Sequence, residues 1–427
     1  MKMRNVLMIT HMFPPFSGVG VIRIAKFARY LPHFGWRPII LTCKRPEKIQ
    51  DATDQSLLKE IGTNVVIYRT ACPSLYSIYR FFGGRVKQGS FGLSENPIGN
   101  FVNQMFIPDP YVGWYFTGRL KAQNIFKAHP IDLIFTTSPR ETPHLIGLSL
   151  KKRYNKPWIA DFRDPWLEKA QRPNRSKLLD YIERYMQKSV LNYSDRILTA
   201  WPGIGREFKK TSASFSDKVE VLYNGFDNDD FCDISPVHFD TFTLLYAGSL
   251  HKALNPEPIF SGLHRLYEKH PDLRQKIQVV LLGRQDAYVH KVVKNYGLQS
   301  EVKTISQVAH RDSLSFVIGA NVLFFCVPDT SWVPSKIFEY MRSNKPILAV
   351  SDSQSEAVRI INSIRPVGCK ASRCPETLYR YILQIYQSSR SHGEEQTMNR
   401  EDLALYDRKS LTADLARYFD EEISKAC

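Results

Sequence analysis

The 427-residue sequence predicts an α/β fold with two doubly wound, Rossmann-like domains that face a central cleft. Two series of apolar strand patterns alternate with helical patterns of about 10–15 residues, which is typical of parallel βαβ units. A polar segment separates the two series. The length suits two or three domains, and a composition that is 43% apolar and 23% charged is typical of a globular protein.

The first domain is predicted over residues 1–235. Apolar runs indicate strands at 5–12, 38–43, 65–69, 132–136, 158–162, 196–200 and 219–223. Amphipathic patterns indicate helices at 19–34, 140–154 and 174–192. An insertion rich in glycine and aromatic residues interrupts this series at about residues 70–118.

The second domain is predicted over residues 236–400, after a linker at 224–240 that contains five aspartates and little apolar periodicity. Its strands are expected at 243–247, 277–282, 302–306, 321–327, 346–350 and 366–369. Its helices are expected at 257–269, 286–296, 310–318, 335–342 and 353–363. A polar run separates this domain from a last segment, 401–427, whose residues 401–425 are predicted to form one helix.

Composition excludes several classes of protein. No apolar run reaches the roughly 18–20 residues of a membrane span, and the first 15 residues lack the long apolar core of a signal peptide. The seven cysteines contain no Cys-x-x-Cys pair, which indicates neither a disulfide framework nor a zinc site. We therefore expect a cytoplasmic protein without a bound metal.

The net charge of +16 is concentrated in the first half of the chain, where residues 1–235 contain 34 Lys and Arg against 21 Asp and Glu. This asymmetry suggests an anionic partner such as nucleic acid, an acidic membrane surface or a phosphorylated small molecule. The alternative is that the charge only favours solubility. Nucleic acid is not expected, because the sequence has no zinc-finger spacing, RNP-type aromatic motif or clear recognition helix.

The first candidate site is the loop Phe-Pro-Pro-Phe-Ser-Gly-Val-Gly at 13–20, between a strand and a helix start. Gly18 and Gly20 would let an anion approach the free N–H groups there. Compared with a dinucleotide-binding fingerprint, the loop has Arg23 in place of the third glycine. The next strand also ends without an acidic residue that could bind the ribose, and both departures disfavour an NAD site. NADP stays open through Arg45, as does a plain βα turn.

The second candidate site follows the strand at 158–162. It contains three charged residues at the carboxyl end, where open α/β sheets bind ligands: Asp161, Arg163 and Asp164. The alternative is an internal Arg–Asp ion pair that fixes the loop. Upstream, Ser138 ends the preceding strand and His144 falls on the next helix, where an ordinary packed histidine is the alternative.

The third candidate site is the segment 333–341, in which Pro334 begins a helix and Lys336 shares a face with Glu339. A lysine in the first helical turn opposes the macrodipole, and this cost is explained if Lys336 binds an anion such as a diphosphate. Glu339 would accept hydrogen bonds from sugar hydroxyls. The alternative is a surface ion pair between these two side chains.

Two further strand ends in the second domain contain glycine followed by cationic or polar residues. The first contributes Gly248, Ser249 and Lys252, and the second contributes Gly283 and Arg284. Because the carboxyl ends of parallel strands meet at one sheet edge, these residues are expected to line one cleft that suits a nucleotide diphosphate.

Five segments, in this order along the whole chain, resemble the family-four glycosyltransferases, which have the GT-B fold. They are FPPFSGVG, WIADFRDPW, VLYNGFDNDDF, YAGSL and PSKIFEYMRSNKPILA, and the last is the most specific. The segment from Ser138 to Trp166 is most similar to members associated with bacterial cell-surface polysaccharide assembly.

The resemblance implies retaining transfer of a sugar from a nucleotide-diphosphate sugar to an acceptor hydroxyl, in polysaccharide or glycolipid synthesis. It implies no permanently bound cofactor and no metal, because helix N-termini and cations neutralise the departing diphosphate. The acceptor would be lipid-linked or a polysaccharide. The basic first half would then bind anionic lipid at the inner face of the membrane.

The resemblance also assigns roles by position. Gly18 and Gly20 would face the donor phosphates or the acceptor, Lys336 and Lys252 would hold the diphosphate, and Glu339 would contact the ribose. Residues 283–285 and 306–308 would lie near the base. Catalytic and acceptor-side roles fall to Asp161, Arg163, Asp164, Ser138 and His144. The segment 401–427 would pack back on the first domain.

Two positions depart from the family pattern. Ser331 stands where a glutamate often contacts the donor sugar, and Ser249 stands where an arginine often follows the glycine. The donor sugar and base, the acceptor and the oligomeric state are not indicated by the sequence. A nucleotide-sugar epimerase, or another enzyme on the same fold, is the alternative function, and a nucleic-acid-binding protein is a remote one.

Overall fold

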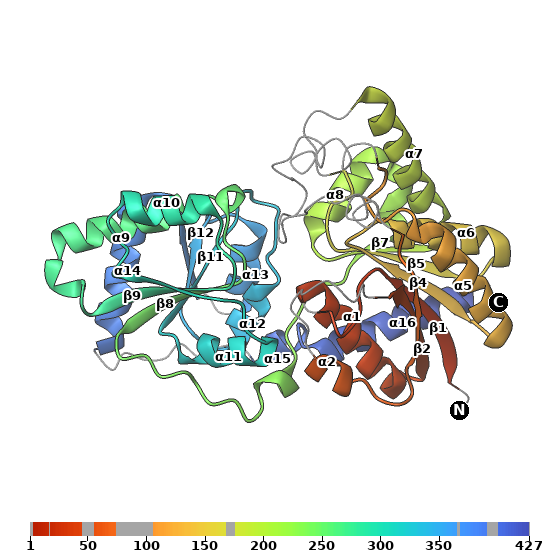
Figure 1. Ribbon diagram of the computed structural model, residues 1–427, viewed down its shortest axis with the longest axis horizontal. Helices are drawn as coiled ribbons and strands as arrows, with labels where there is room; N and C mark the ends of the chain where they lie inside the picture. The colour runs from red at the N-terminus through yellow and green to blue at the C-terminus, as the bar shows by residue number, and fades with distance from the viewer. Residues whose placement is uncertain are drawn as a thin grey trace, which may run out of the picture. The chain divides into compact units, whose positions relative to one another are not determined.

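The computed structural model describes residues 3–16, 18–44, 55–73, 106–167, 176–364, 368–390 and 400–426. The chain forms two compact units (Figure 1). The first comprises Met1–Tyr223 and Leu411–Cys427, and the second comprises Asn224–Ser410. Each unit is a parallel sheet with helices on both faces, which is the predicted α/β class.

The sheet of the first unit has the strand order β3-β2-β1-β4-β5-β6-β7, and all of its pairs are parallel. The strands are β1 Arg4–Thr10, β2 Trp36–Cys43, β3 Val66–Thr70, β4 Leu133–Thr137, β5 Trp158–Phe162, β6 Arg196–Thr199 and β7 Val219–Val221. The chain order reverses between β1 and β4, so the loops that follow these two strands flank a topological switch point.

The helices of the first unit cover a sheet whose central strands are buried on both faces. They are α1 Val19–Tyr30, η1 Leu31–Phe34, α2 Gln55–Lys59, α5 Trp114–Ala128, α6 Thr142–Tyr154, α7 Lys177–Tyr193, α8 Pro202–Thr211 and η3 Ala213–Lys218. Of the predicted insertion at 70–118, residues 74–105 lie outside the described residues, and α5 begins near its end.

The C-terminal segment forms two helices rather than the single helix predicted over 401–425. The helix α15, Arg400–Ala404, ends before a turn, and α16, Arg408–Ala426, then begins. Leu415 and Phe419 of α16 are fully buried in the core of the first unit. Arg196 on β6 also binds Glu422 of α16 at 2.8 Å, so the last helix completes the first unit.

The sheet of the second unit has the strand order β10-β9-β8-β11-β12-β13, again parallel, with its reversal between β8 and β11. The strands are β8 Phe242–Ala247, β9 Ile277–Leu282, β10 Val302–Ile305, β11 Val322–Cys326, β12 Ile347–Val350 and β13 Cys369–Ser372. The last of these begins where the predicted strand 366–369 ends.

The helices of the second unit include one that the sequence did not predict, α14. They are α9 Glu257–Lys269, α10 Ala287–Asn295, α11 His310–Gly319, α12 Lys336–Arg342, α13 Glu356–Ile364 and α14 Pro375–Arg390, with short η4 Asn228–Phe231, η5 Lys252–Leu254 and η6 Pro271–Leu273. Leu378 and Ile382 of α14 pack in the second core. The units divide after Tyr223, whereas the predicted boundary was 235.

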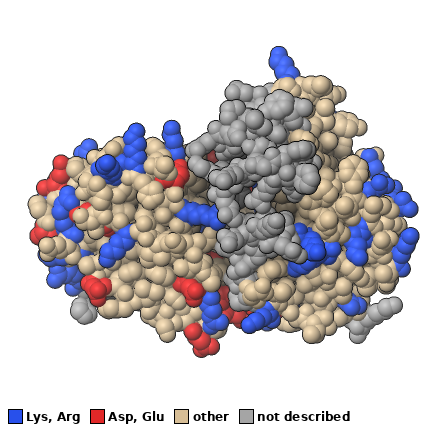
Figure 2. Space-filling view, in the orientation of Figure 1, with Lys and Arg blue, Asp and Glu red and all other residues tan. Residues whose placement is uncertain are grey.

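Basic side chains are dispersed over both units on the face shown in Figure 2. They do not gather into one patch there. Among the described residues, no helix has the length and apolar character that crossing a membrane would require.

Candidate functional site

In the second unit, two glycines allow the loops after β8 and β9 to lie in direct contact. Gly248 and Gly283 have φ angles of 131° and 124°, which L side chains rarely adopt. A Cβ atom on Gly283 would lie 2.5 Å from the Gly248 carbonyl oxygen. The Gly248 N–H donates to the Leu282 carbonyl at 2.7 Å, so backbone bonds fix this close approach.

Lys336, the first residue of α12, extends its side chain to this pair of loops. Its Nζ lies 3.6 Å from the centroid of the Tyr246 ring on β8, and a Cβ atom on Gly248 would lie 2.6 Å from that Nζ. The ring face attracts the ammonium group. The structure therefore brings together Gly248, Gly283 and Lys336, which are far apart in the sequence.

The ammonium group of Lys336 is half-buried and lacks an acidic partner. Within the part of the chain that the structure describes, no carboxylate lies within ion-pair distance of it. Burial lowers the pKa of Lys336 to about 7, while Cys326 and Glu339 oppose this shift. The side chain is therefore a cation that an anionic ligand would stabilise.

Glu339 lies one turn further along α12 and belongs to a chain of polar groups. Its Oε1 is hydrogen-bonded to His310 Nε2 at 2.7 Å, and His310 Nδ1 lies 3.8 Å from the buried Asp230 carboxylate. The predicted alternative, an ion pair between Lys336 and Glu339, does not form. Sequence reasoning missed His310, although its place just after the β10 loop was a usable signal.

The other predicted residues of the second unit lie on the exposed parts of the same loops. Ser249 and Lys252 follow β8, and the Lys252 N–H donates to Asp286 Oδ2 at 2.9 Å. Arg284 follows β9, and its carbonyl accepts a 2.8 Å bond from the Leu250 N–H. Burial also lowers the pKa of His251, and the nearby Lys336 adds to this shift.

In the first unit, the loop after β1 packs against the side chain that follows β5. Gly20 contacts the Arg163 guanidinium so closely that a Cβ atom would collide with it. The Arg163 side chain donates to the Ser138 carbonyl, and its backbone N–H donates to Ser138 Oγ at 3.0 Å. Gly18 is exposed, has a φ of 124°, and caps α1 through its carbonyl.

Asp161 is buried and takes part in an internal ion pair. One carboxylate oxygen accepts a 3.1 Å bond from Arg23 on α1, and both side chains are 1% exposed. The other oxygen accepts a 2.6 Å bond from Thr137 Oγ1. The sequence raised an internal Arg–Asp pair as an alternative, and the structure identifies its arginine as Arg23. Asp161 is the fourth residue of β5 and is not in the loop that follows.

His144 is also buried, so an acceptor in solvent does not reach its ring. Its Nδ1 is hydrogen-bonded to Thr136 Oγ1 at 2.8 Å, and its ring packs on Phe162 at 4.4 Å. Burial lowers the pKa of His144 to about 3, so the ring is neutral. This position favours the alternative interpretation of His144 as an ordinary packed histidine.

Arg163 and Asp164 are the predicted charged residues that stay half-buried at the end of β5. Burial lowers the pKa of Arg163 to about 10, and nearby Asp161 and Asp164 oppose this shift. Burial raises the pKa of Asp164, while Arg163 and Arg140 counteract it. The predicted NADP contact, Arg45, lies outside the described residues.

The sequence matches Glycosyltransferase Family 4 over residues 20–230. Residues 20–230 therefore belong to Glycosyltransferase Family 4. The match covers α1 and β2–β7, including the loop that contains Arg163 and Asp164. No curated protein sequence matches this glycosyltransferase.

Solved structures share the fold of the glycosyltransferase over almost its whole length. Sucrose-phosphate synthase from Thermosynechococcus elongatus is 14% identical with a TM-score of 0.68, and the match covers 99% of this chain and 100% of that one. Anabaena HepE in complex with UDP and glucose is 12% identical with a TM-score of 0.64, covering 98% and 100%. A putative UDP-N-acetylglucosamine 2-epimerase from Listeria monocytogenes is 12% identical with a TM-score of 0.54, covering 98% and 97%.

These likenesses show the GT-B fold of the glycosyltransferase. The two serines that depart from the family pattern lie on exposed or half-buried loops. The Ser249 carbonyl accepts a 3.0 Å bond from Tyr246. Ser331 donates through its N–H and Oγ to Asp329 at 2.7 and 2.8 Å, so a carboxylate lies two residues before the missing glutamate.

Proposed function

We propose that this glycosyltransferase moves a sugar from a nucleotide-diphosphate sugar to an acceptor hydroxyl with retention of configuration, in polysaccharide or glycolipid synthesis. The bond from the anomeric carbon to the diphosphate breaks, a bond to the acceptor oxygen forms, and the acceptor proton passes to the released diphosphate. The observation that carries the proposal is the half-buried ammonium group of Lys336, which has no acidic partner among the described residues.

The second unit provides what a diphosphate leaving group needs. The Lys336 cation adjoins Gly248, where the absence of a side chain lets phosphate oxygens reach the backbone. A cation in a partly desolvated position stabilises developing negative charge more strongly than one in water. We assign Lys252 as a second positive charge on the same loop. We assign Glu339, which is hydrogen-bonded to His310, to the ribose hydroxyls.

The first unit is assigned to the acceptor, with roles that its geometry supports. Arg163 and Asp164 keep partly exposed charges beside the loop that contains Gly18 and Gly20. Ser138 holds Arg163 in place through two hydrogen bonds. The buried pair with Arg23 gives Asp161 a positioning role beneath this loop.

UDP is proposed as the nucleotide, because Anabaena HepE binds UDP and glucose on the same fold. The test is a thermal-shift panel with UDP, GDP, ADP, CMP and NADP. Ligand at about 100 times its dissociation constant should stabilise the protein by about 2.7 kcal/mol. We expect a shift with UDP that Lys336→Met abolishes and Lys294→Met, an exposed lysine on α10, retains.

Two outcomes of this panel would contradict the proposal. A shift with UDP that survives Lys336→Met would place the nucleotide elsewhere. A shift with NADP alone would assign the loop at 13–20 to a dinucleotide and would remove the transferase proposal. In either case the fold and the family would stand.

A nucleotide-sugar epimerase is the second candidate, because the putative epimerase from Listeria monocytogenes has the same fold. The two activities differ in their need for an acceptor. An epimerase converts the nucleotide sugar alone, whereas the transferase releases UDP only when an acceptor hydroxyl is present. Nuclear magnetic resonance of UDP-sugars incubated with the protein alone separates them, and conversion to an epimer would favour the second candidate.

We also propose peripheral binding to anionic lipid through α7. Three apolar side chains lie on one side of this helix at i, i+3 and i+7, and are 66–69% exposed: Leu178, Tyr181 and Tyr185. The net charge of +16 and the excess of basic residues in the first half complement an acidic membrane surface. Aromatic side chains with a polar tip suit the interface of such a membrane.

A further inference from the structure

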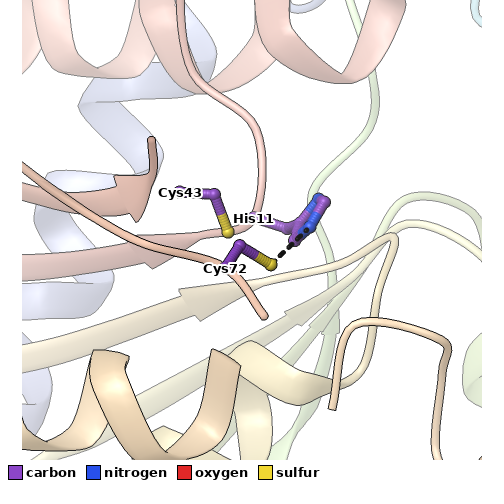
Figure 3. Close-up of side chains that lie close together, drawn as sticks. All are labelled: His11, Cys43 and Cys72. Carbon is purple, nitrogen blue, oxygen red and sulfur yellow. Dashed lines mark hydrogen bonds between the residues drawn. The ribbon is translucent and has the colours of Figure 1, made fainter. Parts of the chain in front are cut away.

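Three residues that are distant in the sequence meet at the carboxyl ends of adjacent strands in the first unit (Figure 3). His11 directly follows β1, Cys43 is the last residue of β2, and Cys72 comes two residues after β3. One imidazole nitrogen and the two sulfur atoms all lie within 4.8 Å of one another. The sequence concealed this cluster because each residue belongs to a different βα unit and no Cys-x-x-Cys spacing is present.

One of the separations is close to the distance between two ligand atoms of a tetrahedral zinc site. Cys72 Sγ lies 3.7 Å from His11 Nε2. With Zn–S of about 2.3 Å and Zn–N of about 2.0 Å at a tetrahedral angle, the S···N edge is about 3.5 Å. The other two ligand separations are within 4.8 Å, against about 3.8 Å for the S···S edge of such a site. Binding of zinc therefore requires side-chain adjustments of up to about 1 Å.

The frame around the cluster is rigid. The His11 carbonyl accepts bonds from Thr42 Oγ1 at 3.1 Å and from the Cys43 N–H at 3.4 Å, which fixes β1 against β2. The His11 ring packs on Tyr111 at 4.2 Å and lies 6.0 Å from Trp114. Ligands held by strand ends in this way are pre-organised for a metal.

Burial and polarity distinguish the cluster from an ordinary hydrophobic contact. His11 is 5% exposed, and its Nδ1 has no hydrogen-bond partner among the described residues. Cys43 is buried, whereas Cys72 is half-buried, so solvent has a route to the sulfur atoms. The His11 ring therefore makes no hydrogen bond to a described residue through Nδ1, and its Nε2 is directed at the Cys72 thiol.

The donor set selects the class of metal. Two thiols and an imidazole suit Zn²⁺, whereas Mg²⁺ and Ca²⁺ require oxygen ligands. Two thiolates would balance the charge of a divalent cation in this buried position. Three protein ligands leave a fourth position for water or another small ligand.

We propose that His11, Cys43 and Cys72 form a zinc site that ties together the ends of β1, β2 and β3. Arg69 on β3 also donates to the Pro14 carbonyl, so the same strand ends support the loop that leads to Gly18. The zinc would stabilise the first unit and hold this loop. The site is independent of the nucleotide site in the second unit.

The test uses the reduced full-length protein after removal of metals with a chelator. Titration with Co²⁺ should produce thiolate-to-cobalt charge-transfer and tetrahedral d–d absorption that saturates at one equivalent and disappears when Zn²⁺ is added. Cys72→Ser should lower zinc affinity by at least about 100-fold. The exposed cysteine variant Cys374→Ser is the matched control and should bind like wild type.

Bound zinc should also protect Cys72 from alkylation by iodoacetamide, which peptide mass spectrometry measures without any activity assay. Cys72 is half-buried, so Cys72→Ser should fold, and unchanged UDP binding would verify this. His11→Gln should weaken the metal and shift the d–d bands. Absence of cobalt absorption in the reduced wild type would overturn the proposal. A Cys43–Cys72 disulfide in a protein that binds no metal after reduction would identify a redox pair instead.

Discussion

At the scale of single residues, Lys336 is the side chain whose environment is hardest to explain by stability alone. Its ammonium group is half-buried against Tyr246 and beside Gly248, without a carboxylate partner among the described residues. Burial of a charge costs free energy that a structural lysine would avoid by extending into water. Such a cost is typical of positions that bind a ligand of opposite charge.

Replacing Lys336 should therefore stabilise the protein while removing nucleotide binding. The folded-state pKa is about 7 against an ordinary value of 10.5, so between these pH values the unfolded chain binds more protons and stability rises with pH. We expect Lys336→Met to raise stability at pH 7 by on the order of 1 kcal/mol. Chemical denaturation measures the gain, and a loss of stability would contradict it.

Nucleotide affinity should depend on pH through the same group. A diphosphate favours protonated Lys336 and raises its pKa, so binding requires proton uptake above pH 7. We expect the Kd of UDP to rise by up to about tenfold per pH unit between pH 7 and the pKa of the complex. Isothermal titration between pH 6.5 and 9 measures this, with Lys294→Met as the control. A flat profile would remove Lys336 from the binding site.

Asp161 should behave as a structural residue. Replacing it with asparagine removes the carboxylate that pairs with Arg23, a side chain that is 1% exposed. The expected loss of stability is about 3 kcal/mol, in line with other broken buried pairs. Urea denaturation of Asp161→Asn, Arg23→Met and the double variant tests it. Normal stability with abolished turnover would instead assign Asp161 to the chemistry.

At the scale of elements, the paired loops after β8 and β9 form the most constrained part of the second unit. Gly248 and Gly283 both adopt positive φ angles, and their backbones lie in contact. Glycine is required here for a backbone conformation and also for space. The main-chain geometry of the two strand ends thus positions the loops around Lys336. A pattern of side chains in the sequence does not predict this geometry.

Gly283→Ala should destabilise the second unit by about 2–3 kcal/mol, because its Cβ would lie 2.5 Å from a carbonyl oxygen and the backbone would have to shift. Gly18→Ala is the matched control, since Gly18 has the same φ of 124° but no atom within 4 Å of the added Cβ. Thermal unfolding of both variants isolates the close approach. Equal losses would show that φ alone matters.

At the scale of the whole molecule, the positions of the strands along the chain and of most helices could be predicted, because buried parallel strands are short apolar runs. The order of the strands within each sheet was not predicted. The break before α16 was missed, and α2, α5, α8 and α14 were not assigned. The position of α14 depends on packing against residues far away in the chain. The ends of the strands could be located from the apolar runs, whereas the direction in which each side chain points could not. Asp161 and His144 point into the core, and burial of that kind is a tertiary property.

Membrane binding is a prediction for the complete molecule. We expect cosedimentation with phosphatidylserine vesicles that falls as salt rises from about 0.1 M to 1 M, where screening shortens from about 10 Å to 3 Å. Leu178→Glu with Tyr181→Glu should abolish it. Leu405→Glu, an equally exposed leucine of the second unit, should not. Salt-independent sedimentation, or equal losses in both variants, would contradict docking through α7.

The path of the chain also sets an order for synthesis. The first unit begins with β1 but lacks part of its core until α16 is made, and the second unit is a continuous stretch that is complete before then. On the ribosome, the second unit can therefore fold first. Until α16 is made, the apolar surface of the first unit that packs against Leu415 and Phe419 stays exposed. A nascent chain stalled before residue 411 would be the species that chaperones bind.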